Sequence, residues 1–168
     1  MLFRRGMSEP RKLRVYAYVN KPYDAVRKLL YARAGEMFPK ATTAAASRAG
    51  SVGAHLKVGA GGVDLGVDVK VQLGALRDEE GPKGMSPVTR VPLTWEAAHA
   101  AALFPAMKGE LSAWPLTATE TQVELDGAYR VPLGAVGNAI DAMVGHRIAE
   151  AAVHRFLDEV VEQIRHEA

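Results

Sequence analysis

The chain has 168 residues, 48% of them hydrophobic and 24% charged, a composition typical of a soluble globular protein. Its 21 basic and 19 acidic side chains leave a formal charge of +2, too slight to indicate nucleic acid as a partner. The absence of cysteine excludes disulfides, thiolate nucleophiles and cysteine-ligated metals.

The N-terminal segment carries no recognisable targeting signal. Basic residues in Met1–Arg5 are not followed by the apolar run of a signal peptide. No stretch approaches the ~18 uninterrupted apolar residues of a transmembrane helix, so we expect a cytoplasmic protein without a membrane span. Met7 is an alternative start. We expect residues 1–10 to form a flexible extension and residues 11–168 a single domain.

The first elements are predicted to be a strand and a helix. Apolar and polar residues alternate over Leu13–Val19, which predicts a half-buried strand. A helical stripe follows over Tyr23–Ala34, and Gly35 is predicted to end that helix. The Ala-, Thr- and Ser-rich segment after Pro39 is compatible with a short second helix or a loop.

From Ser51 onward the hydrophobic period becomes two, which predicts a run of strands. The alternating segments are Val52–Val58, Val67–Leu73, Val91–Trp95, Met107–Ala113 and Val123–Tyr129. We interpret Gly59–Gly62 as a hairpin turn and not a phosphate-binding loop, because no helix follows it. Arg77–Pro87 is predicted to be a hairpin loop. Pro92 on a polar face predicts an edge position or a bulge.

The last forty residues predict one long helix. Between Ala135 and His166 there is a single glycine, Gly145, and no proline. Its apolar residues occupy one face in the first half and nearly the opposite face in the second half. A helix that crosses the sheet and then meets another element or subunit would explain this rotation, as would a kink near Gly145.

Together these elements predict an α+β fold. A curved antiparallel sheet of six to seven strands would wrap around the long C-terminal helix, with one or two short helices after the first strand. The strands have one polar face each, so the sheet is expected to be solvated on one side.

This order of elements resembles the helix-grip superfamily, which includes START lipid-transfer domains, birch-pollen-allergen-like proteins and bacterial polyketide cyclases (SRPBCC). The resemblance covers about Lys12 to His166. The residue pattern of this chain is similar to that of uncharacterised bacterial members of the superfamily. The residues that carry it most specifically are Trp95-Glu96-Ala97, Leu103-Phe104-Pro105, Gly109-Glu110-Leu111, Gly127-Ala128-Tyr129 and Pro132–Gly137. None of them is a catalytic signature. The resemblance implies a pocket between sheet and C-terminal helix that takes lipids, sterols, polyketides or other apolar molecules.

Few inward-facing side chains are suited to catalysis. The strand carboxylates fall on the polar face, and no two histidines have the spacing of a metal pair on a helix, so we expect neither metal nor cofactor. The weak catalytic candidates are Tyr129, His99 and His154. Arg147 and His154 share the first-half face of the long helix and are candidate polar contacts in the cavity. A tyrosine at a strand end is more often a packed residue with a hydrogen-bonded hydroxyl.

We therefore expect a protein that binds or carries an apolar small molecule or lipid and is not itself an enzyme. The alternatives are an enzyme of the polyketide cyclase or dehydratase type, using Tyr129 with His99 or His154, and a protein-interaction module that forms a homodimer. The predicted ligand contacts are Leu56, Val69, Val71, Leu93, Trp95, Met107, Leu111, Val123, Leu125 and Tyr129 on the sheet, and Ile140 and Met143 on the helix.

Overall fold

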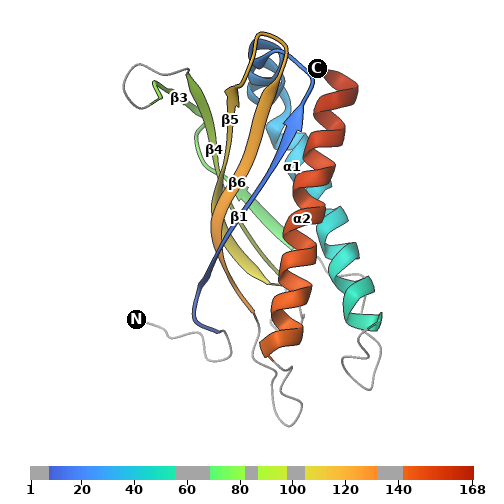
Figure 1. The fold of residues 1–168 in the computed structure, drawn as a ribbon. Coiled ribbons are helices and arrows are strands. Elements are labelled where there is room, and N and C mark those ends of the chain that lie inside the picture. Colours follow the sequence, from blue (N-terminus) through green and yellow to red (C-terminus); the bar gives the residue numbers. More distant parts are fainter. Residues whose placement is uncertain (1–7, 56–68, 82–86, 98–104, 132–141) are drawn as a thin grey trace.

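The structure is a computed structural model that describes residues 8–55, 69–81, 87–97, 105–131 and 142–168. Its elements are β1 (Arg11–Val19), α1 (Tyr23–His55), β2 (Val69–Leu73), β3 (Arg77–Glu79), β4 (Val88–Ala97), β5 (Ala106–Pro115), β6 (Thr121–Arg130) and α2 (Ala142–Glu167). One sheet and a layer of two helices make up this part of the chain (Figure 1). The two helices run in opposite directions and pack against each other.

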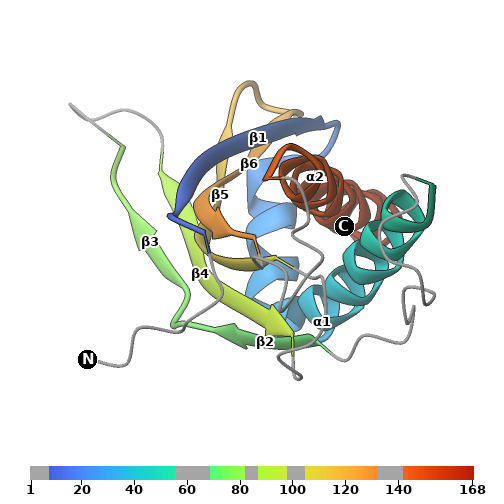
Figure 2. The ribbon, with the colours of Figure 1, turned by 90° about the horizontal axis from the view of Figure 1, so that it is seen from below.

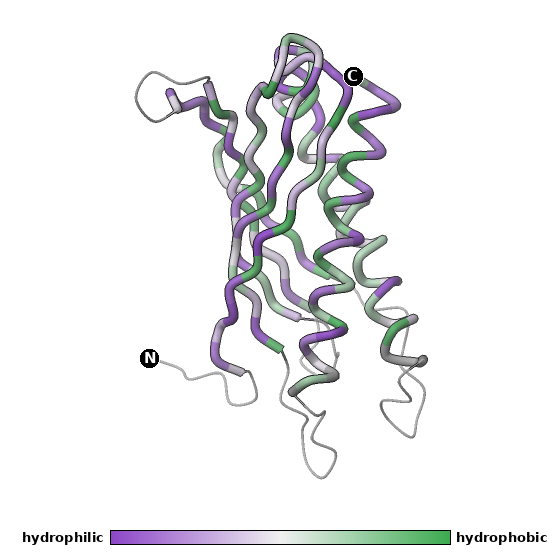
Figure 3. Tube along the Cα trace, viewed as in Figure 1, coloured by the Kyte–Doolittle hydropathy of each residue, from purple (hydrophilic) through white to green (hydrophobic). Residues whose placement is uncertain are grey.

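All strand pairs are antiparallel, in the order β1-β6-β5-β4-β2, with β3 also paired to β4. The sheet curves around the helices, which lie on its inner face (Figure 2). Hydrophobic and hydrophilic residues alternate along the strands, as expected where one face is buried and the other meets water (Figure 3). The predicted α+β helix-grip fold is therefore confirmed. None of the described helices is long and apolar enough to cross a membrane.

Two glycines face each other in the middle of the sheet and permit its curvature. Gly109 of β5 pairs with Gly127 of β6. A Cβ atom at Gly127 would lie 2.7 Å from the carbonyl oxygen of Lys108 and 2.8 Å from the Cα atom of Gly109. Any side chain here would collide with the backbone of the neighbouring strand, and glycine at both positions is a common device of curved sheets.

We predict that Gly127→Ala destabilises the protein by about 1–3 kcal/mol, because the added methyl group must displace backbone. The matched control is Gly35→Ala in α1, where nothing lies within 4 Å of the added Cβ atom. That change should stabilise the protein by up to about 1 kcal/mol through helix propensity. Urea unfolding of both variants measures the difference, and equal effects would contradict this account of the curvature.

Pro92 lies at a bulge, one of the two positions that the sequence predicts. Leu73 of β2 pairs with Leu93, and Arg77 of β3 pairs with Arg90. The three residues between β2 and β3 therefore stand opposite two residues of β4, and this one extra residue is the mark of a β-bulge. The ladder is interrupted where Pro92 has no N–H to donate, while its carbonyl oxygen accepts a hydrogen bond from the Gly74 amide at 2.8 Å.

The helix after β1 is much longer than the sequence predicts. The expected end at Gly35 is wrong, because α1 continues without a break to His55. Its buried stripe passes Gly35 and continues at helical spacing through small residues as far as Ala49. Pro39 is exposed, and the carbonyl group that it deprives of a hydrogen bond belongs to Gly35, which is exposed and can be hydrated. Packing against α2 thus outweighs two local helix-breaking signals.

Two further expectations are wrong in this region. Residues 51–55, predicted as the start of a strand, form the last turn of α1; the rest of that predicted strand lies outside the described residues. Arg77–Glu79, predicted as part of a loop, is the short strand β3. The predicted Gly59–Gly62 turn also lies outside the described residues.

The terminal helix has one continuous buried face in its described part. The buried residues are Gly145, Ile148, Ala149, Ala152, Val153, Phe156, Leu157, Val160, Val161 and Ile164. They follow the i, i+3, i+4 pattern of a single amphipathic stripe. The apolar face predicted for the second half of the helix, Val153 to Ile164, is therefore buried as expected. The residues expected on the other face lie outside the described side chains, except Met143, which is 65% exposed.

At the far end of the inner face, a chain of hydrogen bonds joins α1 to the sheet. The Tyr23 hydroxyl lies 2.6 Å from Thr89 Oγ1, and Thr89 donates to Asp78 Oδ1 at 2.8 Å. Arg27 donates to the other carboxylate oxygen of Asp78, also at 2.8 Å. The Arg27 hydrogen bond lowers the pKa of Asp78 and outweighs partial burial, which acts in the opposite direction.

A carboxyl group whose pKa is lower in the folded state stabilises the fold above its unfolded pKa of about 3.9 and ceases to do so as the pH falls through the folded value. We therefore predict that the unfolding free energy drops below about pH 4, and drops less in Asp78→Asn than in the wild type. Arg27→Gln, which keeps the carboxyl group, should reduce the same pH dependence. Wild-type slopes in both variants, measured by urea unfolding at several pH values, would contradict the assignment.

Candidate functional site

The strand register aligns one row of side chains across the inner face, near the end where β4 and β6 finish. Arg11 pairs with Tyr129, Tyr129 with Met107, Met107 with Trp95, and Trp95 with Val71. The three central members of the row are almost fully buried. The next row along the strands contains the facing glycines Gly109 and Gly127.

Tyr129 brings a hydroxyl group into the central part of this row. Its side chain is 1% exposed, and its hydroxyl lies 3.0 Å from Nδ1 of His146 on α2. The two rings meet edge to face, with centroids 5.6 Å apart. Burial raises the pKa of Tyr129, although the nearby Arg11 charge acts against it, so the hydroxyl keeps its proton at neutral pH. Depending on the histidine tautomer, that hydroxyl donates to Nδ1 or accepts from it.

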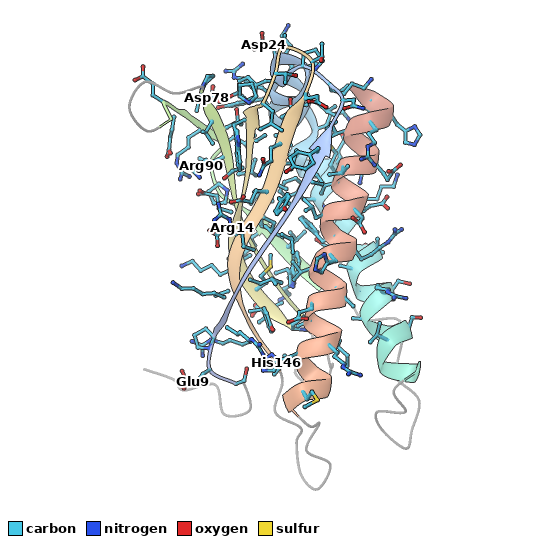
Figure 4. The ribbon with its side chains drawn as sticks, viewed as in Figure 1. Glu9, Arg14, Asp24, Asp78, Arg90 and His146 are labelled. Atoms are coloured by element: carbon cyan, nitrogen blue, oxygen red, sulfur yellow. The ribbon has the colours of Figure 1, made fainter. Side chains whose placement is uncertain are left out.

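A close contact between α2 and the end of β6 positions His146. A Cβ atom at Gly145 would lie 3.1 Å from Cβ of Val131, so only glycine lets the helix come this near without displacing the valine. His146 is the next residue and is partly buried near the lower end of α2 (Figure 4). The sequence shows His146 on the predicted helix but contains no signal for its partner, because the pairing depends on where α2 meets β6.

Most of the predicted sheet contacts lie on the inner face. Those that are buried are Leu93, Trp95, Met107, Leu111, Val123, Leu125 and Tyr129, while Val69 and Val71 are partly buried against the same core. Trp95 is also a structural residue: its Nε1 donates to the Pro105 carbonyl at 3.0 Å, and its ring lies 4.9 Å from that of Phe156.

The helix candidates do not join this row. His154 and Arg147 are exposed, so their predicted contact with an inner cavity is wrong in this structure. His154 lies eight residues after His146, about 12 Å along the helix axis, and does not pair with Tyr129. Met143 is 65% exposed and does not close the inner face. Leu56, His99 and Ile140 lie outside the described residues.

Two other features bear on ligands. No group of three or more His, Asp or Glu side chains that could hold a metal ion occurs within the described ranges. A cavity of about 430 Å³ lies against the outer face of the sheet, on the side opposite to the predicted pocket. Its lining includes Lys70, Lys108 and Arg130.

The outer face also departs from expectation at Glu124, which the sequence predicts to be solvated. Its side chain is 7% exposed and is paired with Arg14 at 2.8 Å.

The chain thus has a helix-grip fold with a tyrosine–histidine pair at one end of its apolar inner face. No protein-family model matches the sequence, and no curated protein was found to match it.

Solved structures of similar architecture include three with descriptive names. The ZhuI aromatase/cyclase from Streptomyces sp. R1128 has 16% identity and a TM-score of 0.43, over 93% of this chain and 94% of that one. A START superfamily protein from Mycobacterium smegmatis has 11% identity and a TM-score of 0.45, over 94% and 99%. Norcoclaurine synthase from Thalictrum flavum has 9% identity and a TM-score of 0.43, over 93% and 87%.

Because these identities and TM-scores are low, the fold is assigned from this chain's own sheet and helices. The names of the similar proteins describe those proteins alone.

We predict that Tyr129 and His146 are energetically coupled. In a double-mutant cycle of Tyr129→Phe and His146→Ala, the coupling energy should be about 0.5–1.5 kcal/mol, the net contribution of a hydrogen bond in a partly buried site. Urea unfolding of the wild type, both single variants and the double variant measures it. Additive effects of the two changes would show that the pair contributes no interaction energy.

Proposed function

We propose that this protein binds an apolar small molecule or lipid between the inner face of its sheet and α2, with Tyr129 and His146 at the polar end of the ligand. The observation that carries the proposal is the chemistry of the inner row. Its apolar members offer dispersion contacts, and a single hydroxyl with its histidine partner offers one directed hydrogen bond. This combination suits a largely hydrophobic guest with one oxygen.

The position of the pair supports the same reading. The Tyr129 side chain is buried, whereas His146 is only partly buried. A ligand oxygen could replace or share the hydrogen bond between them without leaving a buried polar group unpaired. The facing glycines next to this row remove side-chain volume from the middle of the inner face, where a cross-strand pair of larger residues would otherwise stand.

A second candidate function is proton transfer on a polyketide-like substrate. It is favoured by the hydrogen-bond distance between a phenol and an imidazole, which are a proton donor and a proton acceptor suited to general acid–base catalysis. In this version Tyr129 acts with His146, and not with the His154 expected from the sequence. Turnover of a reactive polyketone probe that is lost in His146→Gln would favour the enzyme over the carrier.

Binding is tested first by native mass spectrometry of protein purified from its own host, which should show a bound apolar molecule. The delipidated protein is then titrated with 1-naphthol and with naphthalene, which differ by one hydroxyl. We predict that Tyr129→Phe weakens 1-naphthol binding by up to about tenfold, the worth of one hydrogen bond, and leaves naphthalene binding unchanged.

The matched control is Tyr23→Phe, which also removes a buried, hydrogen-bonded tyrosine hydroxyl, but at the far end of the inner face. It should have a comparable effect on stability and none on either titration. If no molecule co-purifies and neither probe binds, the proposal is wrong. Equal loss of 1-naphthol binding in both variants would also overturn it.

A further inference from the structure

The outer face of the sheet carries a pocket that the proposed function does not use. Its volume of about 430 Å³ lies within the roughly 300–1,000 Å³ of small-molecule sites. The lining includes Pro10, Lys70, Thr94, Lys108, Ala128 and Arg130. They come from β2, β4, β5, β6 and the residue before β1.

The strand register explains why a depression forms here. Lys108 pairs with Thr94 on one side and with Ala128 on the other, and Arg130 pairs with Ala106. The two alanines are short and are flanked by long side chains, so the surface is low over the alanines and raised around them. The floor is therefore apolar and the rim is basic.

The charges of this pocket differ from those of the rest of the outer face. Farther along the sheet, three arginines are paired: Arg14 with Glu124, and both Arg77 and Arg90 with Glu79 and Glu110. Within the part of the chain that the structure describes, none of the ion pairs includes Lys70, Lys108 or Arg130. Three cations thus share the pocket with one carboxylate, that of Glu96, which has an interaction of its own.

We propose that this outer pocket binds an organic phosphate. A phosphate monoester carries about −1.5 to −2 charge at neutral pH, which balances the positive excess. Arg130 can hold two phosphate oxygens at once, Lys70 and Lys108 supply ammonium donors, and Thr94 and Gln72 add neutral donors. The organic part of the ligand rests on Pro10, Ala106 and Ala128. The pocket is larger than a bare phosphate ion requires, which favours an ester over the free ion.

The test titrates the protein with 1-naphthyl phosphate, 1-naphthoate, inorganic phosphate and 1-naphthol. 1-Naphthyl phosphate should bind more tightly than 1-naphthoate or inorganic phosphate, and added salt should weaken its binding. Lys108→Gln and Arg130→Gln should each raise its Kd about tenfold, the effect of losing one charge-assisted hydrogen bond. The matched control is Lys28→Gln on α1, which changes the net charge equally and should leave the Kd within about twofold.

The same variants separate this site from the inner one. Tyr129→Phe should not change 1-naphthyl phosphate binding, and Lys108→Gln should not change 1-naphthol binding. Vesicles of phosphatidylcholine with and without phosphatidic acid test whether the phosphate belongs to a lipid headgroup: Lys108-dependent binding to the phosphatidic acid vesicles supports that source. The proposal is overturned if neither the ester nor these vesicles bind, if 1-naphthoate binds as tightly as the ester, or if Lys28→Gln weakens binding as much as Lys108→Gln.

Discussion

The ring of Phe156 on α2 contacts both the sheet and α1. It lies 4.9 Å from the Trp95 ring on β4 and 5.5 Å from the Phe38 ring on α1, edge to face with the latter. Because α2 is fixed at this point against both the sheet and α1, its other positions follow from helical geometry. His146, ten residues earlier, is about 15 Å along the axis, where β6 ends. The tyrosine–histidine pair therefore depends on a contact made far from it.

Glycines are involved both in the curvature of the sheet and in the placement of α2. The facing glycines let the sheet bend around the helices, and Gly145 lets α2 approach Val131. The aromatic contacts fill the middle of the interface between sheet and helices. The polar pair at the end of the inner face and the basic pocket on the outer face lie at the same end of the sheet, although they face opposite ways.

Much of the fold could be predicted from local pattern. The period-two alternation places Trp95, Met107 and Tyr129 on one face of the sheet, because successive side chains of a strand point to opposite sides. The same reasoning identifies Pro92 as a point where the ladder is interrupted. It fails at Gly35 and Pro39, since local helix-breaking preferences are small beside the burial of a stripe that extends on both sides of them. It also fails at residues 51–55, whose alternation is too short to distinguish a strand from a helix end.

The sequence by itself determined the class of the fold and the apolar character of the inner face, because both follow from periodicities written along the chain. It also determined that Tyr129 would lie among the inward-facing residues of the sheet, because of its position in the alternation. Only the tertiary structure decided that Tyr129 meets His146 and that His154 points to solvent, since residues 17 or 25 positions away along the chain come together only through the packing of α2. The basic pocket likewise arises from cross-strand neighbours, whose proximity no linear pattern encodes.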